Sequence, residues 1–231
     1  MQTYTIMNKK LFILLAALML TTGAFAQLIK NKTDDRISLG VDVFTDFQLK
    51  TNDNWVPRKF NQGVSTWITY NFPLGKKSKH QVSLGVGMSS HNYYSKSRIV
   101  NPYESELTFV QYSDSSNFKR FKINPTYVEI PLELRFRIKD AVKIGVGFKF
   151  GIRVAAKTKY VGSDEMGEKI YEKYTHINKE ILERYAYSAT VRIGYKWITA
   201  YACFQMNRVF SEASGGPSIF PISVGLSLSP F

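Results

Sequence analysis

The segment Thr126 to Ile138, TYVEIPLELRFRI, alternates strictly between two kinds of residue. From Val128 onward its even-numbered positions hold only large apolar side chains, while its odd-numbered positions include two glutamates and two arginines. Alternation with a period of two predicts a β-strand with one apolar and one polar face. The charged face would be costly to bury against an apolar core. A transmembrane barrel instead turns such a face into its polar lumen and exposes the apolar face to lipid.

The first 26 residues have the features of a secretory signal peptide. A short basic region at Lys9 and Lys10 precedes an apolar run from Leu11 to Leu20 and an A-x-A site at Ala24 to Ala26. The apolar run is too short to be a membrane-spanning helix. We therefore expect cleavage before Gln27 and export to the outer membrane. The mature chain, residues 27–231, has a length that suits a single barrel domain.

The charge and the cysteine count limit the classes of partner. The chain has a formal net charge of +13 and one cysteine, Cys203, so it cannot form an intramolecular disulfide. A basic chain can bind nucleic acid, but an exported one is expected to meet membrane phosphates. We predict a monomeric barrel in contact with outer-membrane lipids and lipopolysaccharide, or with other envelope proteins, and no nucleic acid. A solvated basic surface without a partner explains the charge equally well.

Seven further segments alternate in the same way, and the connections between them are alternately long and short. This rhythm predicts an all-β fold: an eight-stranded antiparallel up-and-down transmembrane β-barrel with long extracellular loops and short periplasmic turns. A soluble β-sandwich is the alternative, but it should scatter charge over its outer face. Within the long connection 156–183, apolar residues from Ile170 to Ile181 have helical spacing, with a continued strand as the alternative. The seven segments are residues 37–48, 64–72, 81–89, 142–154, 185–194, 198–206 and 220–229.

Small and aromatic residues have positions that suit this barrel. Aromatic residues near the short turns would form a girdle at the periplasmic interface. Glycines on the inward parity would leave room for large charged side chains in a narrow lumen. The aromatic residues are Tyr70, Phe72, Phe136, Tyr195 and Trp197, and the glycines are Gly40, Gly85, Gly87, Gly145, Gly147, Gly151, Gly194 and Gly225.

The strand at 126–138 resembles a known pattern, Y-x-E-I-P-L-x-L-[KR], of the PorT-like outer-membrane β-barrel proteins of Bacteroidetes. The chain departs from that pattern at Glu133, where a less charged residue is usual. With the signal peptide and the strand plan, the resemblance covers nearly the whole mature chain. It implies an envelope location, a barrel fold and a link to protein secretion. The matching residues are Tyr127, Glu129, Ile130, Pro131, Leu132, Leu134 and Arg135.

Inward-facing charges form the main candidate site. A three-residue turn at 139–141 would place Lys149 diagonally between Glu129 and Glu133, within about 7 to 8 Å of each. Buried charges must be paired, so we predict a structural ion-pair network that fills the lumen. A proton or ion path through a narrow pore is the alternative function. The predicted lumen network comprises Asp42, Asp46, Glu129, Glu133, Arg135, Arg137, Lys143, Lys149, Arg153 and Arg192.

A lipid-modifying enzyme is the third hypothesis for such a barrel. It would require a serine, a histidine base and an acidic group that orients the histidine. His91 has Ser89, Ser90 and Ser95 nearby, but no carboxylate is predicted at its depth, and we place His91 in an outer loop. No metal-ligand spacing or nucleotide fingerprint occurs. We therefore expect no catalytic residues, no metal and no cofactor.

The outer loops contain a second candidate set, in which aromatic and basic residues are mixed. Such a mixture suits contact with another protein or with lipopolysaccharide phosphates. It equally suits strands that merely continue above the membrane. The set comprises Tyr93, Tyr94, Lys96, Arg98, Tyr112, Lys119, Arg120 and Lys122. The most direct function is an interaction or assembly component of the envelope. We also expect Pro131, which has no N–H to donate, to mark a bulge or a gap in the strand ladder.

Overall fold

The computed structural model describes residues 36–50, 54–75, 80–111, 119–138, 142–163 and 168–229. The predicted signal peptide, Tyr112 and the predicted turn at 139–141 lie outside these ranges, so they remain predictions. Among the described residues, no helix is both long enough and apolar enough to cross a membrane.

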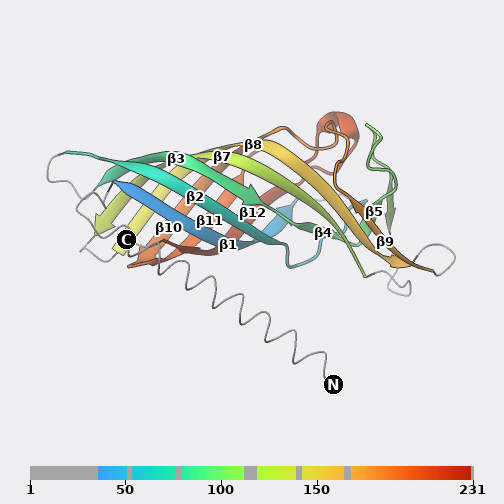
Figure 1. Ribbon diagram of the computed structural model, residues 1–231, viewed down its shortest axis with the longest axis horizontal. Coiled ribbons are helices and arrows are strands. Elements are labelled where there is room, and N and C mark those ends of the chain that lie inside the picture. Colours follow the sequence, from blue (N-terminus) through green and yellow to red (C-terminus); the bar gives the residue numbers. More distant parts are fainter. Residues whose placement is uncertain are drawn as a thin grey trace, which may run out of the picture.

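Antiparallel strands form a closed barrel (Figure 1). The sheet runs in the order β4-β7-β3-β2-β1-β12-β11-β10-β8-β9, and a further pairing between β7 and β8 closes the ring. This confirms the predicted all-β barrel class. In the described ranges the strands are β1 (Ile37–Leu49), β2 (Gln62–Pro73), β3 (Gln81–Ser90), β4 (Tyr93–Ser95), β5 (Ser97–Ile99), β6 (Phe109–Gln111), β7 (Arg120–Ile138), β8 (Val142–Ser163), β9 (Lys169–Tyr174), β10 (Tyr185–Tyr195), β11 (Ile198–Gln205) and β12 (Phe220–Leu228), and these ranges also contain the 3-10 turn η1 (Glu212–Ser214).

Two strands extend well beyond the barrel at its outer end. β7 begins six residues before the predicted Thr126, and β8 continues nine residues past the predicted Val154. The short strands β4 and β9 pair with these extensions. Figure 1 shows β7 and β8 running toward the end of the molecule where β4, β5 and β9 lie. Residues 169–174 form β9, so the strand alternative is correct there, whereas residues 175–183 belong to neither a helix nor a named strand and the helix alternative is wrong.

Apolar side chains cover the outside of the barrel. On β7, Ile130, Leu132 and Leu134 are each more than two-fifths exposed, while Glu129 and Glu133 on the same strand are buried. This arrangement is the reverse of a soluble protein and is the one that a lipid environment requires. Near the short turns the predicted aromatic residues Tyr70, Phe72, Phe136, Tyr195 and Trp197 are exposed.

The register between β7 and β8 is the one predicted from the turn length. Glu133 lies opposite Gly147, and Glu129 lies opposite Gly151. Toward the outer end the register shifts between Thr126 and Tyr127, which leaves Val154 of β8 without a partner. This β-bulge reverses the parity of β8, so odd-numbered residues beyond it face outward.

Pro131 coincides with a gap in the ladder. The pairing of β3 with β7 passes from Leu84 and Leu132 directly to Gly87 and Glu129, so two residue pairs around Pro131 are missing. The missing pairs confirm the predicted gap, and its physical reason is that proline has no N–H to donate. The β-bulge of this pair of strands lies elsewhere, at Val154.

An apolar cluster at the outer end was not predicted. Its centre is Trp55, whose ring makes edge contacts with those of Phe109, Phe121 and Phe210 at centroid distances of 5.9, 6.2 and 5.5 Å. Long loops bring these residues together over the end of the polar lumen. We call this cluster the outer core; its buried members are Trp55, Tyr93, Ile99, Leu107, Phe121, Ile123, Tyr160, Ile177, Ile181, Leu182, Val209, Phe210 and Ile219.

Phe44 is an inward aromatic residue that depends on two glycines. It lies opposite Gly63 on β2 and Gly225 on β12. A Cβ atom at Gly63 would collide with the Phe44 ring, and one at Gly225 would collide with the backbone of Phe44. Large inward side chains are thus accommodated by glycines on the flanking strands.

Gly63→Val should therefore destabilise the barrel by about 1 to 3 kcal/mol, as overpacking typically does. The same substitution in a Phe44→Ala background should cost much less, because the ring that it meets is absent. Urea unfolding in detergent, followed by heat-modifiable gel migration, measures both increments. Equal costs in the two backgrounds would show that the two residues are not coupled.

Candidate functional site

The inner half of the lumen is organised around Arg192 of β10. Its two Nη atoms donate to the two carboxylate oxygens of Asp42, each at 2.8 Å, and its Nε donates to Glu133 at 2.9 Å. Glu133 also accepts a hydrogen bond from Arg135 Nε at 2.9 Å. The guanidinium of Arg192 packs against the rings of Trp67 and Tyr201, whose centroids are 5.1 and 4.4 Å away. Bidentate, stacked contacts of this kind suit arginine and not lysine.

A second polar chain fills the outer half of the lumen. Lys149 Nζ donates to Glu129 Oε2 at 2.9 Å, and Ser89 Oγ donates to Glu129 Oε1 at 2.8 Å. His91 Nδ1 lies 2.9 Å from Asp46 Oδ2, and Ser223 Oγ donates to Asp46 Oδ1 at 2.6 Å. All six side chains of this second polar network are buried. Each lumen carboxylate therefore faces at least one basic side chain, as buried charges require.

Ser89, His91 and Asp46 are connected in the order of a hydrolase triad. The prediction that His91 has no carboxylate at its depth is wrong, and so is its placement in an outer loop, because it lies inside the lumen beside Asp46. Its Nε2 lies 3.3 Å from Ser89 Oγ. The single O–H of Ser89 is directed to Glu129, so in this arrangement it is not donated to His91. A serine nucleophile needs that transfer, from its hydroxyl to the histidine.

Three residues of the predicted lumen network lie away from both of these groups of ion pairs and hydrogen bonds. Arg153 is near the outer end, where its Nη2 donates to the carbonyl of Lys179 at 2.6 Å. Lys143 Nζ donates to the carbonyl of Lys196 at 3.0 Å, at the end with the short turns. Arg137 lies at that same end, beside Lys143. These three basic residues therefore lie near the two ends of the barrel and outside the two networks that fill the lumen.

The second candidate set is also divided by the fold. Tyr93 is fully buried in the outer core, so it cannot be a contact residue for a partner. Arg98 forms an ion pair with Glu172 and packs over the ring of Tyr160. Lys122 of β7 donates to Asn92 Oδ1 at 2.6 Å, and its Nζ lies 5.7 Å from the centroid of the Tyr94 ring. Lys96 and Lys119 are exposed.

The extensions of β7, β8 and β9 share one strongly basic face. Lys122 lies directly opposite Lys159, and Lys159 lies directly opposite Lys173. The other face of the extensions carries Phe121 and Tyr160, which belong to the outer core. No carboxylate occurs on the basic side among the described residues of the three extensions. We call it the outer basic face; it comprises Arg120, Lys122, Lys157, Lys159, Lys169 and Lys173.

Two physical effects act on the charges of this face. Partial burial and the nearby charges of Arg120 and Lys159 lower the pKa of Lys122. A hydrogen bond from Lys159, together with its charge, lowers the pKa of Tyr171. For Lys122 burial is the larger cause and the neighbouring positive charges the second, whereas for Tyr171 the hydrogen bond and charge of Lys159 lower the pKa. Among the described residues of the three extensions, no acidic side chain on this face balances these charges.

Sequence reasoning identified Arg120 and Lys122 of the outer basic face but missed its four residues on β8 and β9. Lys157 and Lys159 would face inward if the alternation of β8 continued unbroken, and only the bulge at Val154 turns them outward. The sequence does contain a signal, because polar residues occupy both parities from Lys157 to Lys159. The inward position of His91 could have been found from its parity with Ser89. Among the described residues, no group of three or more His, Cys, Asp or Glu side chains could hold a metal ion.

Comparisons with known proteins bear on the family. The model of a family described as outer membrane protein beta-barrel domain matches residues 25–214. Two crystal structures of Ail, the attachment invasion locus protein of Yersinia pestis, are similar in fold: one is 12% identical with a TM-score of 0.39, and the other, in complex with the heparin analogue sucrose octasulfate, is 14% identical with a TM-score of 0.38. Each alignment covers 84% of this chain and 97% of the other. Likenesses at this level do not indicate a shared function. None of the curated proteins matches the chain.

Arg192→Met should destabilise the barrel strongly, by about 3 to 5 kcal/mol, because it leaves Asp42 and Glu133 as buried charges without their main partner. Arg208→Met is the control: Arg208 pairs with the largely exposed Glu212, at 3.0 Å, and should lose no more than about 1 kcal/mol. Urea unfolding in detergent measures both. Similar losses for the two variants would contradict the central role of Arg192.

The purified protein should show no conductance steps in planar lipid bilayers. The ion pairs fill the lumen, and the cavity beside His91 and Lys149 has only about 10 Å³, roughly the space of one water molecule. Stepwise currents that change in Glu133→Gln would instead support the ion path.

Proposed function

Because the chain belongs to the outer membrane protein beta-barrel domain family, we propose that it is an interaction component of the cell envelope. Its outer basic face would hold an anionic partner in the lipopolysaccharide layer. The barrel anchors this face just above the outer leaflet, where lipid A and core-sugar phosphates are concentrated. We propose no catalytic role, since Ser89 is fully buried and its proton is directed away from His91.

The observation that carries this proposal is the row formed by Lys122, Lys159 and Lys173. Like charges directly opposite each other on neighbouring strands destabilise a sheet, and strands lie only about 4.8 Å apart. A row of three such residues is unfavourable for the isolated protein. An anionic partner that bridges the row would remove the repulsion, and each cation near an anionic surface contributes about 1 kcal/mol.

Aromatic side chains support the same face. The Lys122 and Lys159 ammonium groups lie near the rings of Tyr94 and Tyr171, at 5.7 and 4.5 Å from the centroids. Tyrosines beside cations add hydrogen-bonding hydroxyls and flat apolar surface, which suit phosphorylated sugars. The outer core behind the face keeps the three strands in one sheet.

The predicted resemblance to PorT-like proteins supports a finer proposal, that the barrel takes part in protein secretion. A pull-down from native outer membranes tests it. Recovery of secretion components with the barrel would support the link, and their absence would leave the interaction role without it. The cleaved signal peptide remains a prediction.

Replacing Lys122, Lys159 and Lys173 together by glutamine should reduce co-purifying lipopolysaccharide on the order of 100-fold, at about 1 kcal/mol per cation. The barrel itself should become no less stable, since the substitutions remove like-charge repulsion. Lipopolysaccharide per mole of folded protein, assayed at low and high salt, is the measurement.

The control variant replaces Lys50, Lys59 and Lys179, which are exposed and lie outside the row, so the change in net charge is the same. The row variant should lose lipopolysaccharide and the control should retain it. Equal retention by both would contradict the proposal. An equal loss of lipopolysaccharide in the two variants would show that binding depends only on net charge, which would also contradict a specific role for the row.

A further inference from the structure

The strand β9 leaves one edge of the ten-stranded sheet without a neighbour among the described residues. The order of this sheet begins at β4 and ends at β9, and the pairing of β7 with β8 closes the barrel wall between them. β9 pairs with the extension of β8 at the outer end of the molecule (Figure 1). In an antiparallel strand, every second residue directs its N–H and C=O groups toward the same side. Every second residue of β9 therefore presents these groups away from β8.

The opposite edge of the same sheet is covered by the chain itself. Residues 56–58 run along β4 on the side that β7 does not occupy. The Arg58 N–H donates to the Tyr94 carbonyl at 3.0 Å, and the Lys96 N–H donates to the Val56 carbonyl at 2.9 Å. The β9 edge has no corresponding segment in the part of the chain that the structure describes. Exposed backbone groups of this kind are a ready template for pairing with another chain.

One face of β9 is fixed by contacts with the rest of the outer end. Ile170 and Tyr174 pack against the outer core. Between them, Glu172 forms an ion pair with Arg98 of β5. These contacts hold β9 in an extended conformation before any partner arrives. A preformed edge lowers the entropy that must be lost on binding.

The other face of β9 is basic and exposed, with Lys169 and Lys173 on either side of Tyr171. Lysines on an edge strand discourage pairing with a like-charged edge. Two copies of β9 paired about Tyr171 would place Lys169 of each copy opposite Lys173 of the other. Like charges directly opposite each other are destabilising, whereas opposite charges are favourable. The edge therefore suits a strand that carries carboxylates better than a second copy of itself.

We propose that the β9 edge binds an extended acidic segment of another protein, which joins the sheet as a further strand. Its backbone pairs with the outward N–H and C=O groups of β9, as in other cases of strand addition. Two carboxylates face Lys169 and Lys173, and an apolar or aromatic residue midway between them faces Tyr171. This inference goes beyond the binding of lipopolysaccharide, because a saccharide has no strand backbone to pair with the edge.

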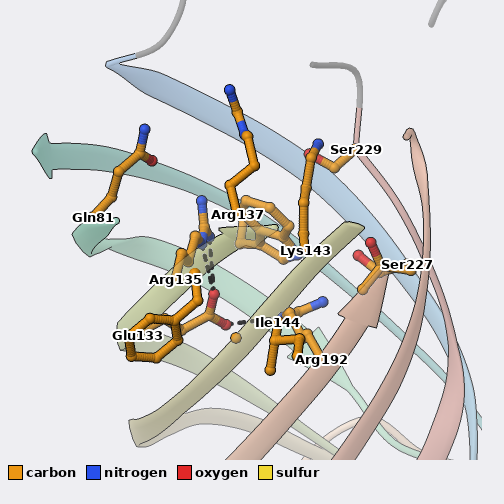
Figure 2. A pocket seen from close by; sticks show the side chains of 13 residues that line it. Gln81, Glu133, Arg135, Arg137, Lys143, Ile144, Arg192, Ser227 and Ser229 are labelled. Carbon is orange, nitrogen blue, oxygen red and sulfur yellow. Dashed lines mark hydrogen bonds and ion pairs between the residues drawn. The ribbon is translucent and has the colours of Figure 1, made fainter. Parts of the chain in front are cut away.

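The interior of the barrel does not admit such a segment. Its charged side chains bond one another across the lumen, and Figure 2 shows the Glu133 carboxylate joined to Arg135 and Arg192. The cavity beside His91 and Lys149 has only about 10 Å³. A partner strand is therefore restricted to the surface of the molecule, where the β9 edge lies.

The first test uses a short synthetic peptide with the central sequence Glu-Thr-Tyr-Val-Glu. It is added to the full-length barrel in detergent, after removal of lipopolysaccharide, and binding is followed by the fluorescence anisotropy of a labelled peptide. A matched peptide with Lys-Thr-Tyr-Val-Lys should bind more weakly, on the order of 10-fold, because its charges repel those of β9. Equal binding of the two peptides would overturn the acidic partner.

Two N-methylated forms of the acidic peptide test the backbone pairing. One carries its methyl groups on the nitrogens of the glutamates and the tyrosine, and the other on those of the threonine and the valine. Only one of these two sets of N–H groups faces β9 in a paired strand. One form should therefore lose binding while the other retains it. The same affinity for both forms, or no binding of the acidic peptide at all, would overturn the proposal.

Variants of the barrel locate the site. Lys169→Gln/Lys173→Gln should weaken binding of the acidic peptide on the order of 10-fold. The control Lys50→Gln/Lys59→Gln removes the same charge from exposed positions outside β9 and should leave the affinity unchanged. Equal affinities of the two variants would refute the β9 edge. Heat-modifiable gel migration shows that each variant is folded.

The same assay separates this inference from the proposed function. Lys122→Gln/Lys159→Gln, which weakens the row on β7 and β8, should reduce lipopolysaccharide binding and leave peptide binding largely intact. A barrel that binds lipopolysaccharide but not the acidic peptide would refute the β9 edge and leave the proposed function standing. A barrel that binds the peptide but not lipopolysaccharide would have the opposite meaning.

Discussion

The contact of Arg192 with Asp42 and Glu133 is the interaction on which the rest of the barrel depends. These residues belong to β10, β1 and β7, and no two of these strands are hydrogen-bonded to each other. The sheet alone holds each strand to its neighbours around the ring, whereas Arg192 joins the ring across its lumen. The lipid-facing surface must be apolar, so the charges of the chain can only lie inside or at the ends. Inside a narrow lumen they must be paired, and the pairs fill the space that a channel would need.

A filled lumen leaves the two ends of the barrel as its surfaces for contact with other molecules, and the two ends differ in construction. At the outer end, apolar side chains from several loops pack around Trp55 and support a sheet whose exposed face carries Lys122, Lys159 and Lys173. At the end with the short turns, the described residues form no such core, and a cavity there is lined by Arg137 and Lys143 among others.

Much of the barrel could be predicted, because its environment repeats at every second residue. The alternation in β7 placed Glu129 and Glu133 inside, and the turn length set the register that brings Lys149 to Glu129. The same reasoning failed for Tyr93 and His91, which were assigned to outer loops but are buried. It failed because loops have no such period, and their packing depends on residues far apart in the chain, such as Trp55 and Phe210.

The sequence by itself determined which faces of the barrel strands meet lipid, that the carboxylates of Asp42, Asp46, Glu129 and Glu133 lie in the lumen, and that Pro131 interrupts the ladder. These features follow from local backbone geometry and from a solvent that accepts no exposed charge. Only the tertiary structure decided how Arg192 divides its bonds between Asp42 and Glu133, and how the outer loops form a core. It also decided on which side Lys157 and Lys159 lie. A single extra residue at Val154 reverses the parity of β8, and a bulge is defined only by its pairing with another strand.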